Sequence, residues 1–127
     1  MDPPIPDDVR SLLQARVESF EHLEILLLLS QHHGSFWTAE SVSKRLDIAE
    51  SLAAEALDHL CRGNLLDVRL GEEVLVFRYA AGTASLDSAV KNLARVYADQ
   101  RAHVMRIMND NAIARVRQMA MALLRMR

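Results

Sequence analysis

Apolar residues recur at helical spacing through the first third of the chain. An acidic pair after Pro6 can cap a first helix, and Ser19 can cap a second one that ends at Gly34. The same spacing also fits one continuous helix over residues 8–33. The apolar positions that share a face are Val9, Leu12, Leu13 and Val17 in the first segment, and Phe20, Leu23, Leu26 and Leu27 in the second.

A further helical pattern begins at Thr38, the clearest helix start in the chain. Thr38 can cap this short helix, and Trp37 before it can pack on Val42 as a hydrophobic staple. After a tight turn at 47–48, another helix is predicted over 49–62. The predicted buried stripe of this last helix consists of Leu52, Ala53, Ala56, Leu57, Leu60 and Cys61.

Alternation of period two replaces the helical spacing beyond this helix. Two strand-like runs, 65–70 and 74–79, flank a Gly-Glu-Glu turn at 71–73 and predict a β-hairpin. Asn64 stands where the preceding helix must end, and asparagine tolerates the left-handed backbone needed there. We therefore expect a group of helices followed by a two-stranded sheet.

Helical spacing returns after a break at 82–83, with Ser85 as the predicted cap of a helical arm over 86–127. Steps of four and three residues form a coiled-coil seam that includes the polar Gln100, and an Asn-Asp-Asn run at 109–111 interrupts it. The seam consists of Leu86, Val90, Leu93, Tyr97, Val104 and Ile107. Beyond the interruption, apolar positions resume on a shifted face at Ile113, Val116, Ala120 and Leu123.

Two partners for the apolar faces of the arm stay open at this point. The arm can pack on its own domain, or it can pair with a second copy of the chain. We favour a homodimer, because some forty residues of helix offer more apolar face than one small domain can cover. Whether the arm is one helix or two also stays open.

The order helix, short helix, tight turn, helix, hairpin is that of a winged helix-turn-helix. The run 37–48 resembles the "T-A-x-x-(apolar)-x-x-x-L-G-(apolar)" pattern of MarR-like bacterial transcriptional regulators. Leu57, Leu60 and 64–66 are similar to that family's "L-x-x-L-x-x-x-G-L-(apolar)" continuation into the wing. The resemblance covers roughly residues 20–80. It implies a mainly α fold with a three-helix core and a two-stranded β-wing, to which the apolar seam adds a long C-terminal helical dimerisation arm.

The resemblance also implies that the exposed face of helix 49–62 enters the major groove of DNA. That face is atypically acidic, because it carries Glu50, Glu55 and Asp58, and two more glutamates occupy the wing tip at 72–73. Carboxylates repel the phosphates of DNA, so binding depends on the donors around them. The predicted nucleic-acid contacts are Lys44, Arg45, Ser51, Arg62, Arg69 and Arg78.

The net charge changes sign between the predicted winged helix-turn-helix and the helical arm that follows it. We predict an N-terminal arm with the first helix over 1–19, a winged helix-turn-helix over 20–80 and a helical arm over 84–127. Residues 35–80 carry eight acids and five bases, a charge of −3, whereas residues 81–127 carry three acids and eight bases, a charge of +5. The prediction is a homodimeric, DNA-binding transcriptional regulator. The alternative is an adaptor that has lost DNA binding and contacts another protein through its acidic face or basic arm.

Other classes of function are disfavoured by the sequence. The single cysteine, Cys61, excludes an internal disulfide and is typical of a reducing compartment, so we expect a cytoplasmic protein. The histidines lack the spacing of metal ligands, and no phosphate loop, nucleophile elbow or metalloprotease histidine pair is present. The longest apolar run, 25–29, is too short to cross a membrane. We expect no enzyme activity, cofactor, metal or membrane partner.

Overall fold

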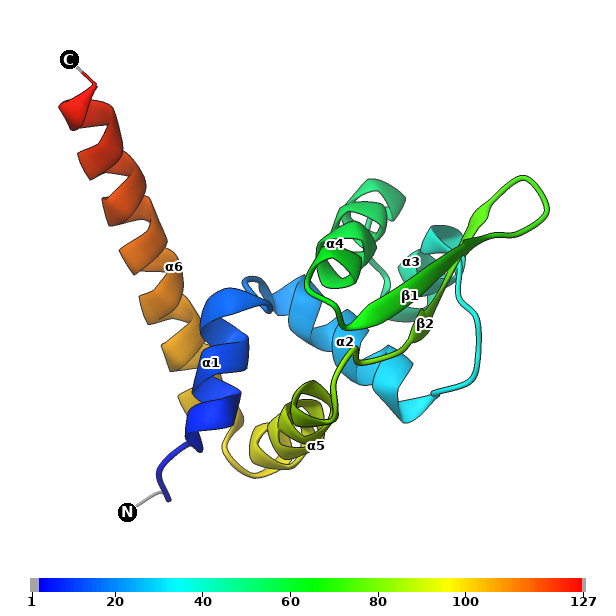
Figure 1. The fold of residues 1–127 in the computed structure, drawn as a ribbon, viewed down its shortest axis with the longest axis horizontal. Coiled ribbons are helices and arrows are strands. Elements are labelled where there is room, and N and C mark those ends of the chain that lie inside the picture. Colours follow the sequence, from blue (N-terminus) through cyan, green and yellow to red (C-terminus); the bar gives the residue numbers. More distant parts are fainter. Residues whose placement is uncertain (1–2, 127) are drawn as a thin grey trace.

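The computed structural model describes residues 3–126, which form six helices and a two-stranded antiparallel sheet (Figure 1). In chain order the elements are α1 (Asp7–Ala15), α2 (Phe20–Gln31), α3 (Ala39–Leu46), α4 (Glu50–Arg62), β1 (Leu66–Leu70), β2 (Leu75–Tyr79), α5 (Ala84–Asp99) and α6 (Arg101–Arg125). This order confirms the predicted mainly α winged helix-turn-helix fold. Residues 1–2 and 127, the ends of the two predicted arms, lie outside the described residues.

Two separate helices, α1 and α2, replace the continuous helix that the spacing also allowed. The Ser19 hydroxyl accepts a hydrogen bond from the backbone N–H of His22 at 3.1 Å. In return, the Nδ1 atom of the His22 ring accepts one from the N–H of Ser19 at 3.3 Å. This reciprocal capping box makes Ser19 the start of α2, because a capped N-terminus leaves no helical hydrogen bond running back into α1.

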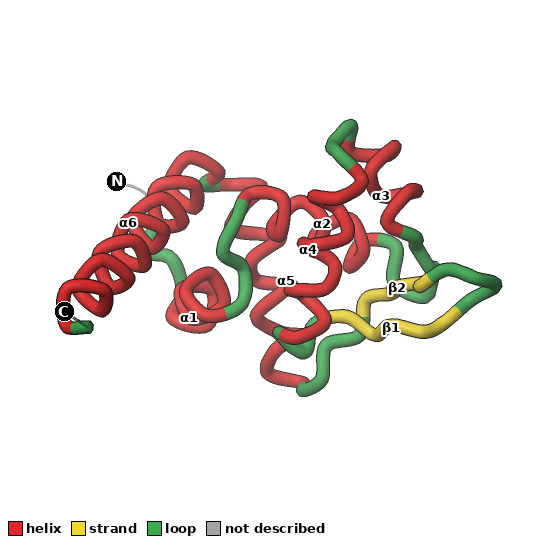
Figure 2. Tube along the Cα trace, turned by 90° about the horizontal axis from the view of Figure 1, so that it is seen from above, coloured by secondary structure: helices red, strands yellow, loops and turns green. Residues whose placement is uncertain are grey.

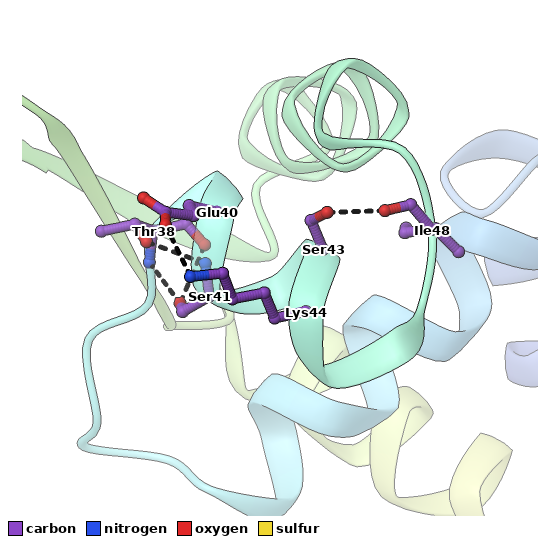
Figure 3. Close-up of polar contacts among 6 residues, drawn as sticks. All are labelled: Thr38, Glu40, Ser41, Ser43, Lys44 and Ile48. Carbon is purple, nitrogen blue, oxygen red and sulfur yellow. Dashed lines mark hydrogen bonds and ion pairs between the residues drawn. The ribbon is translucent and has the colours of Figure 1, made fainter.

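The helix-turn-helix consists of α3, a tight turn and α4. Thr38 caps α3 as predicted: its hydroxyl accepts from the N–H of Ser41 at 3.0 Å, and the Ser41 hydroxyl oxygen accepts from the N–H of Thr38 at 2.9 Å (Figure 3). Asp47 ends α3 in the left-handed conformation, with φ 55°. The Ser43 hydroxyl then donates to the carbonyl of Ile48 at 2.6 Å across the turn (Figure 3). Local hydrogen bonds therefore fix the angle at which α4 leaves α3.

The buried stripe of α4 is narrower than the sequence predicted. Its middle, formed by Ala53, Ala56, Leu57 and Leu60, is buried in the core. Leu52 was expected in the same stripe, but it is 37% exposed, and Cys61 is only half-buried. Leu52 precedes the buried Ala53 and Cys61 follows the buried Leu60, so both residues lie at the edge of the stripe.

The hairpin pairs Leu66 with Tyr79 and Leu70 with Leu75 at its two ends. Asn64 adopts the left-handed conformation before it, with φ 63°, as the sequence predicted. The chain before α3 adds one more backbone pair to β2, because Trp37 and Phe77 exchange two hydrogen bonds of 2.7 Å. This bridge attaches the hairpin to the start of the helix-turn-helix.

The base of the molecule is formed by α1, α5 and α6. Figures 1 and 2 show α6 beside α1, with the distal half of α6 extending away from the hairpin. The cap of α5 is Thr83 and not Ser85, because the Thr83 hydroxyl accepts from the N–H of Leu86 at 3.1 Å. The helical region breaks at Gln100, whose φ of −135° is not helical.

The predicted interruption at 109–111 lies inside α6 and does not break it. Exposed asparagine and aspartate lower helix stability by well under about 1 kcal/mol each, and neither glycine nor proline is present there. The break at Gln100 instead turns the chain, so that α5 and α6 pack on each other and both contact α1. The arm is therefore two helices.

The residues of the predicted dimer seam face the chain's own core. The middle of the seam, Val90, Leu93 and Val104, is buried in a single protomer. The other three residues are partly buried against the same core: Leu86, Tyr97 and Ile107. For this stretch, packing on its own domain is the correct alternative, since α1 and α2 supply the covering surface. A second copy has no access to the buried members of this seam.

Candidate nucleic-acid interface

The outer face of α4 is the surface that the helix-turn-helix presents to solvent. Ser51 is exposed in its first turn, and Arg62 is exposed in its last turn. Between them, Glu50, Glu55 and Asp58 are exposed as well. The acidic recognition face expected from the sequence is therefore present on the folded molecule, with one hydroxyl and one guanidinium among three carboxylates.

The two cations of α3 lie in its last turn, next to the turn that leads to α4. Lys44 donates to Glu40 at 2.8 Å, one helical turn earlier (Figure 3). This hydrogen bond lowers the pKa of the Glu40 carboxyl and raises the pKa of the Lys44 amine. Arg45 is exposed and forms no ion pair with any residue between 3 and 126. Of the two, Arg45 is the cation available to a phosphate.

The other predicted cations are held by neighbouring carboxylates. Arg62 contacts Asp58 at 3.1 Å on α4. Arg69 and Arg78 share Asp67, each at 3.5 Å, and both guanidinium groups also approach the ring of Phe36. Four of the six predicted contact residues therefore already have an acidic partner within the chain.

Arg69 and Arg78 lie on the side of the hairpin that faces away from the groove beside α4, so they do not extend the α4 face. Strand alternation places them with Asp67 on one side, while Val68 and Phe77 lie on the other. A groove between α4 and the hairpin is lined by residues of that second, apolar side. Lys44, Arg45, Ser51 and Arg62 thus belong to the helix-turn-helix itself, whereas the two strand arginines lie on the side of the hairpin that faces away from the groove.

The wing tip differs from the polar tip that a DNA-contacting wing usually has. Leu70 is 77% exposed and Leu75 is 51% exposed. The turn between them is acidic, with Glu72 and Glu73 both exposed. Apolar and negative side chains therefore dominate the tip. The glutamates at the tip could be identified from the sequence. The exposure of the leucines could not, because alternating apolar residues are equally typical of a hairpin whose apolar side is covered by the core.

A histidine stack behind α4, which the sequence did not reveal, joins it to the base. The rings of His22 and His59 stack with centroids 4.0 Å apart, and the Nε2 atom of His59 lies 3.1 Å from the carbonyl of Arg16. Burial, and then the neighbouring His59, lower the pKa of His22 from 6.5 to about 4. The ring is therefore neutral, and its Nδ1 stays free to accept the backbone hydrogen bonds of the α2 cap.

The same junction is tied to α1 and α6 by two arginines. The Arg16 guanidinium donates to the carbonyl of Gly63 at the end of α4. The Arg115 guanidinium on α6 donates to the carbonyl of Glu18 at 3.1 Å. These residues come from four segments far apart in the chain, so spacing alone could not have found them. They fix α4 relative to the base from which α6 extends.

The distal half of α6 leaves many of its apolar side chains exposed. Val104 and Met108 in its proximal half are buried against the core. In the distal half, Val116 is 66% exposed and Leu123 is 64% exposed. The remaining exposed apolar side chains there are Ile113, Met119, Met121, Leu124 and Met126. The second, shifted face predicted from the sequence is therefore the part of the arm that a protomer leaves open.

Neither a metal cluster nor a reactive thiol stands out in the part of the chain that the structure describes. No group of three or more His, Cys, Asp or Glu side chains is placed to hold a metal ion there. Burial raises the pKa of the Cys61 thiol to about 11, with further contributions from Asp58 and Asp67. The search of residues 3–126 for a helix long and apolar enough to cross a membrane finds none.

No protein-family model matches the chain, and no curated protein matches it at a significant level. Solved structures do match. The transcriptional regulator HlyU from Vibrio vulnificus is 19% identical, with a TM-score of 0.52 over 70% of this chain and 84% of that one. ZitR from Lactococcus lactis, as a point mutant, is 13% identical, with a TM-score of 0.55 over 100% of this chain and 82% of that one.

A third solved structure is the homodimeric winged helix-turn-helix DNA-binding domain Mb0332 from Mycobacterium bovis, described as a possible ArsR-family transcriptional regulator. It is 20% identical, with a TM-score of 0.54 over 79% of this chain and 92% of that one. At these identities the likeness shows the fold alone. The chain has the fold of winged helix-turn-helix transcriptional regulators, and the comparisons do not single out the MarR-like group.

Proposed function

We propose that the protein is a homodimeric winged-helix transcriptional regulator that contacts duplex DNA through α4 and the cations around it, as the resemblance to MarR-like regulators implies. The observation that carries the proposal is the free outer face of α4. This face projects from a helix-turn-helix beside a wing, the arrangement in which a recognition helix enters the major groove. The solved structures with the same fold include proteins described as transcriptional regulators.

DNA contact would begin with Arg45 and Ser51, which have no acidic partner to release among residues 3–126. Lys44 and Arg62 can join them, because each is held by an exposed carboxylate four residues away on the same helix. Such exposed pairs contribute only about 0.3–0.5 kcal/mol, so a phosphate can replace the carboxylate at small cost. Arg69 and Arg78 are further from α4 and would contact the backbone beside it. The expected binding is weak and falls steeply with salt.

The homodimer would form through the distal half of α6. Exposed apolar side chains such as Val116 and Leu123 need a cover that the protomer does not supply. A second copy offers the same surface, and two-fold pairing of one helix with its copy is the commonest way to bury it. Methionines along this helix can adapt to the partner's surface. The solved neighbour described as homodimeric supports a homodimer, without indicating which surface forms it.

The test is a titration of the full chain with mixed-sequence duplex DNA at several salt concentrations. We expect binding at low salt, with a logarithmic salt slope that falls by about one when Arg45 is replaced by Gln. Asp110→Asn and Arg125→Gln, on α6, serve as controls that should leave the slope nearly unchanged. Absence of binding even at about 20 mM salt would exclude DNA as the ligand of this face.

A second candidate function is a protein-binding adaptor, and a specific observation favours it. Four of the six predicted DNA-contacting side chains are neutralised within the chain, and the wing tip is apolar and acidic. A surface of this kind is poorly suited to a polyanion and well suited to a positively charged protein segment. Under this candidate, the fold is kept as a scaffold while α4 and the wing contact a protein.

A further inference from the structure

An uncovered groove runs between α4 and the hairpin. It has a volume of about 500 Å³, within the range of about 300–1,000 Å³ that ligand-binding clefts occupy. Its apolar lining comes from both sides: Ala54 from α4, and Val68, Leu75 and Phe77 from the strands. Phe77 is buried, whereas Val68 and Leu75 are exposed. The apolar side of the hairpin therefore continues past the core into solvent.

Carboxylates surround this groove. Glu50 and Asp58 lie along its α4 side, Glu40 lies at the start of α3, and Glu73 lies at the wing turn. Glu40 and Asp58 each have one exposed cationic partner, while Glu50 and Glu73 have none among residues 3–126. The rim is therefore net negative.

The hairpin arginines do not offset this charge at the groove. Arg69 and Arg78 lie on the opposite side of the two strands, where both contact Asp67. Cys61 also lines the groove, and burial is the main cause of the raised pKa of its thiol, with a smaller contribution from Asp58 on the rim. An anionic ligand would meet repulsion here, and a cationic one would be attracted.

We propose that this groove is a docking site for a basic amphipathic helix of a partner protein. The inference rests on the adaptor function proposed above and names its partner. Leucine-sized side chains at i, i+4 and i+7 of the partner would lie on Val68, Leu75 and Ala54. Lysine or arginine side chains beside them would reach Glu50 and Glu73. Apolar contact supplies the affinity, and the ring of carboxylates selects a positive partner and orients it.

A helix fits this site better than an extended strand does. The groove is formed by the side chains of α4 and by one face of the hairpin, and not by a free strand edge. Strand addition needs a row of unpaired backbone N–H and C=O groups, and a face made of side chains offers none. A helix instead inserts its own side chains between such elements. Mixed-sequence DNA is the competing ligand. Removal of groove carboxylates should weaken the binding of a basic helix and strengthen the binding of DNA, so the two ligands can be distinguished.

The experiment uses the full chain and a fluorescein-labelled helical peptide of about 18 residues made of Leu, Ala and Lys, with leucines on one face. The groove variant combines Glu50→Gln, Asp58→Asn and Glu73→Gln. The matched control combines Asp47→Asn, Glu55→Gln and Glu72→Gln, which removes three exposed charges that do not line the groove. Anisotropy at about 50 mM salt gives the peptide affinity, and the same variants are titrated with duplex DNA.

We expect the groove variant to bind the peptide about tenfold or more weakly, and the control to stay within about twofold. Duplex DNA should respond with the opposite sign, because removal of three carboxylates lowers the repulsion of phosphates. In the wild-type chain, peptide binding should shift the amide NMR signals of α4 and of the hairpin, including those of Ala54 and Leu75. Unchanged circular dichroism shows that each variant is folded.

Three results overturn the inference: no peptide binding at low salt, equal binding by the groove variant, or amide shifts confined to α6. Failure of the DNA-binding proposal looks different. In that case the wild-type chain does not bind duplex DNA, while it still binds the peptide and the groove variant binds the peptide more weakly. If the peptide binds equally to all variants while DNA binding strengthens in the groove variant, the groove inference fails and DNA remains the ligand of this face.

Discussion

Two surfaces of the protein leave apolar side chains in solvent, and they carry opposite charges. The groove between α4 and the hairpin exposes Val68 and Leu75 within a ring of carboxylates. The distal half of α6 exposes Val116 and Leu123 among arginines, in the segment whose charge is +5. The groove is concave and lined by residues of α3, α4 and both strands, whereas the α6 surface is a single convex helix.

The difference indicates two kinds of partner. A convex helix with a broad exposed apolar side is best covered by a copy of itself, because identical surfaces match under two-fold symmetry. A concave groove with a charged rim selects a partner of different shape and opposite charge. The fold thus separates a surface for assembly from a surface for recognition. The histidine and arginine junction between them holds the two in a fixed relation.

The largest expected effect is a loss of stability, and it distinguishes the buried core from the two exposed apolar surfaces. Leu57→Ala removes a fully buried side chain and should lower the free energy of unfolding by about 2–5 kcal/mol through the cavity it leaves. Leu75→Ala makes the same chemical change in the groove and should cost less than about 1 kcal/mol. Urea denaturation measures both. A large cost for Leu75→Ala would mean that the groove is already covered in solution.

The next effect concerns assembly. Val116→Arg combined with Leu123→Arg places two charges on the proposed α6 interface and should weaken the dimer at least about hundredfold, equivalent to about 2.7 kcal/mol. Light scattering at micromolar concentration should then report the mass of a 14.3 kDa monomer. Gln118→Arg, a polar position on the same helix, is the control. A wild-type chain that is already monomeric would contradict the assembly surface.

A smaller effect tests whether α4 approaches DNA at all. Glu55→Gln with Asp58→Asn removes two repelling charges and frees Arg62, so non-specific affinity for duplex DNA should rise several-fold at low salt. Asp99→Asn with Asp110→Asn makes the same charge change on the base and should alter binding less. Loss of a tight, sequence-specific complex in the α4 variant would mean that these acids contact bases.

The smallest effect concerns the junction between the surfaces. The folded-state pKa of His22 is about 4, below its usual 6.5, so the unfolded chain binds the proton first as pH falls. Stability is therefore full above about pH 6.5 and decreases as the pH falls toward 4. Because the ring is only half-buried and solvent screens it, the loss should be about 1 kcal/mol.

His22→Gln is the matched variant for this effect. Glutamine at the same position keeps a side-chain acceptor for the α2 capping box and has no proton to gain. Its denaturation midpoint should therefore vary less than that of the wild-type chain between pH 6.5 and pH 4. An identical pH dependence of the two proteins would show that another group is responsible.

Local signals in the sequence predicted most of the fold. Thr38 and Ser19 were identified as caps because a capping hydroxyl acts over three residues. Asn64 was expected to adopt left-handed backbone and does, and the tight turn expected at 47–48 begins with Asp47 in the same conformation. The strands and α4 were placed within one or two residues of their ends, since alternation and helical spacing are also local.

The site was predicted less completely, because a charge in the sequence does not reveal its neighbour in space. Arg78 was expected to be available to DNA, but cross-strand pairing places Asp67 beside it. The seam residue Val104 was assigned to a second copy, because the break at Gln100 and the return of α6 onto α1 could not be read from spacing. Apolar spacing indicates that a helix face must be covered. It does not indicate whether the chain's own helices or a second copy covers it.

The sequence by itself determined which elements form and which segments are acidic or basic, since propensity, capping and charge depend on residues a few positions apart. Only the tertiary structure decided which apolar faces stay uncovered. The core buries the apolar side chains that its helices can contact. Those left exposed lie in the groove between α4 and the hairpin and on the distal half of α6. Burial depends on contacts between distant segments, and those contacts exist only in the folded chain.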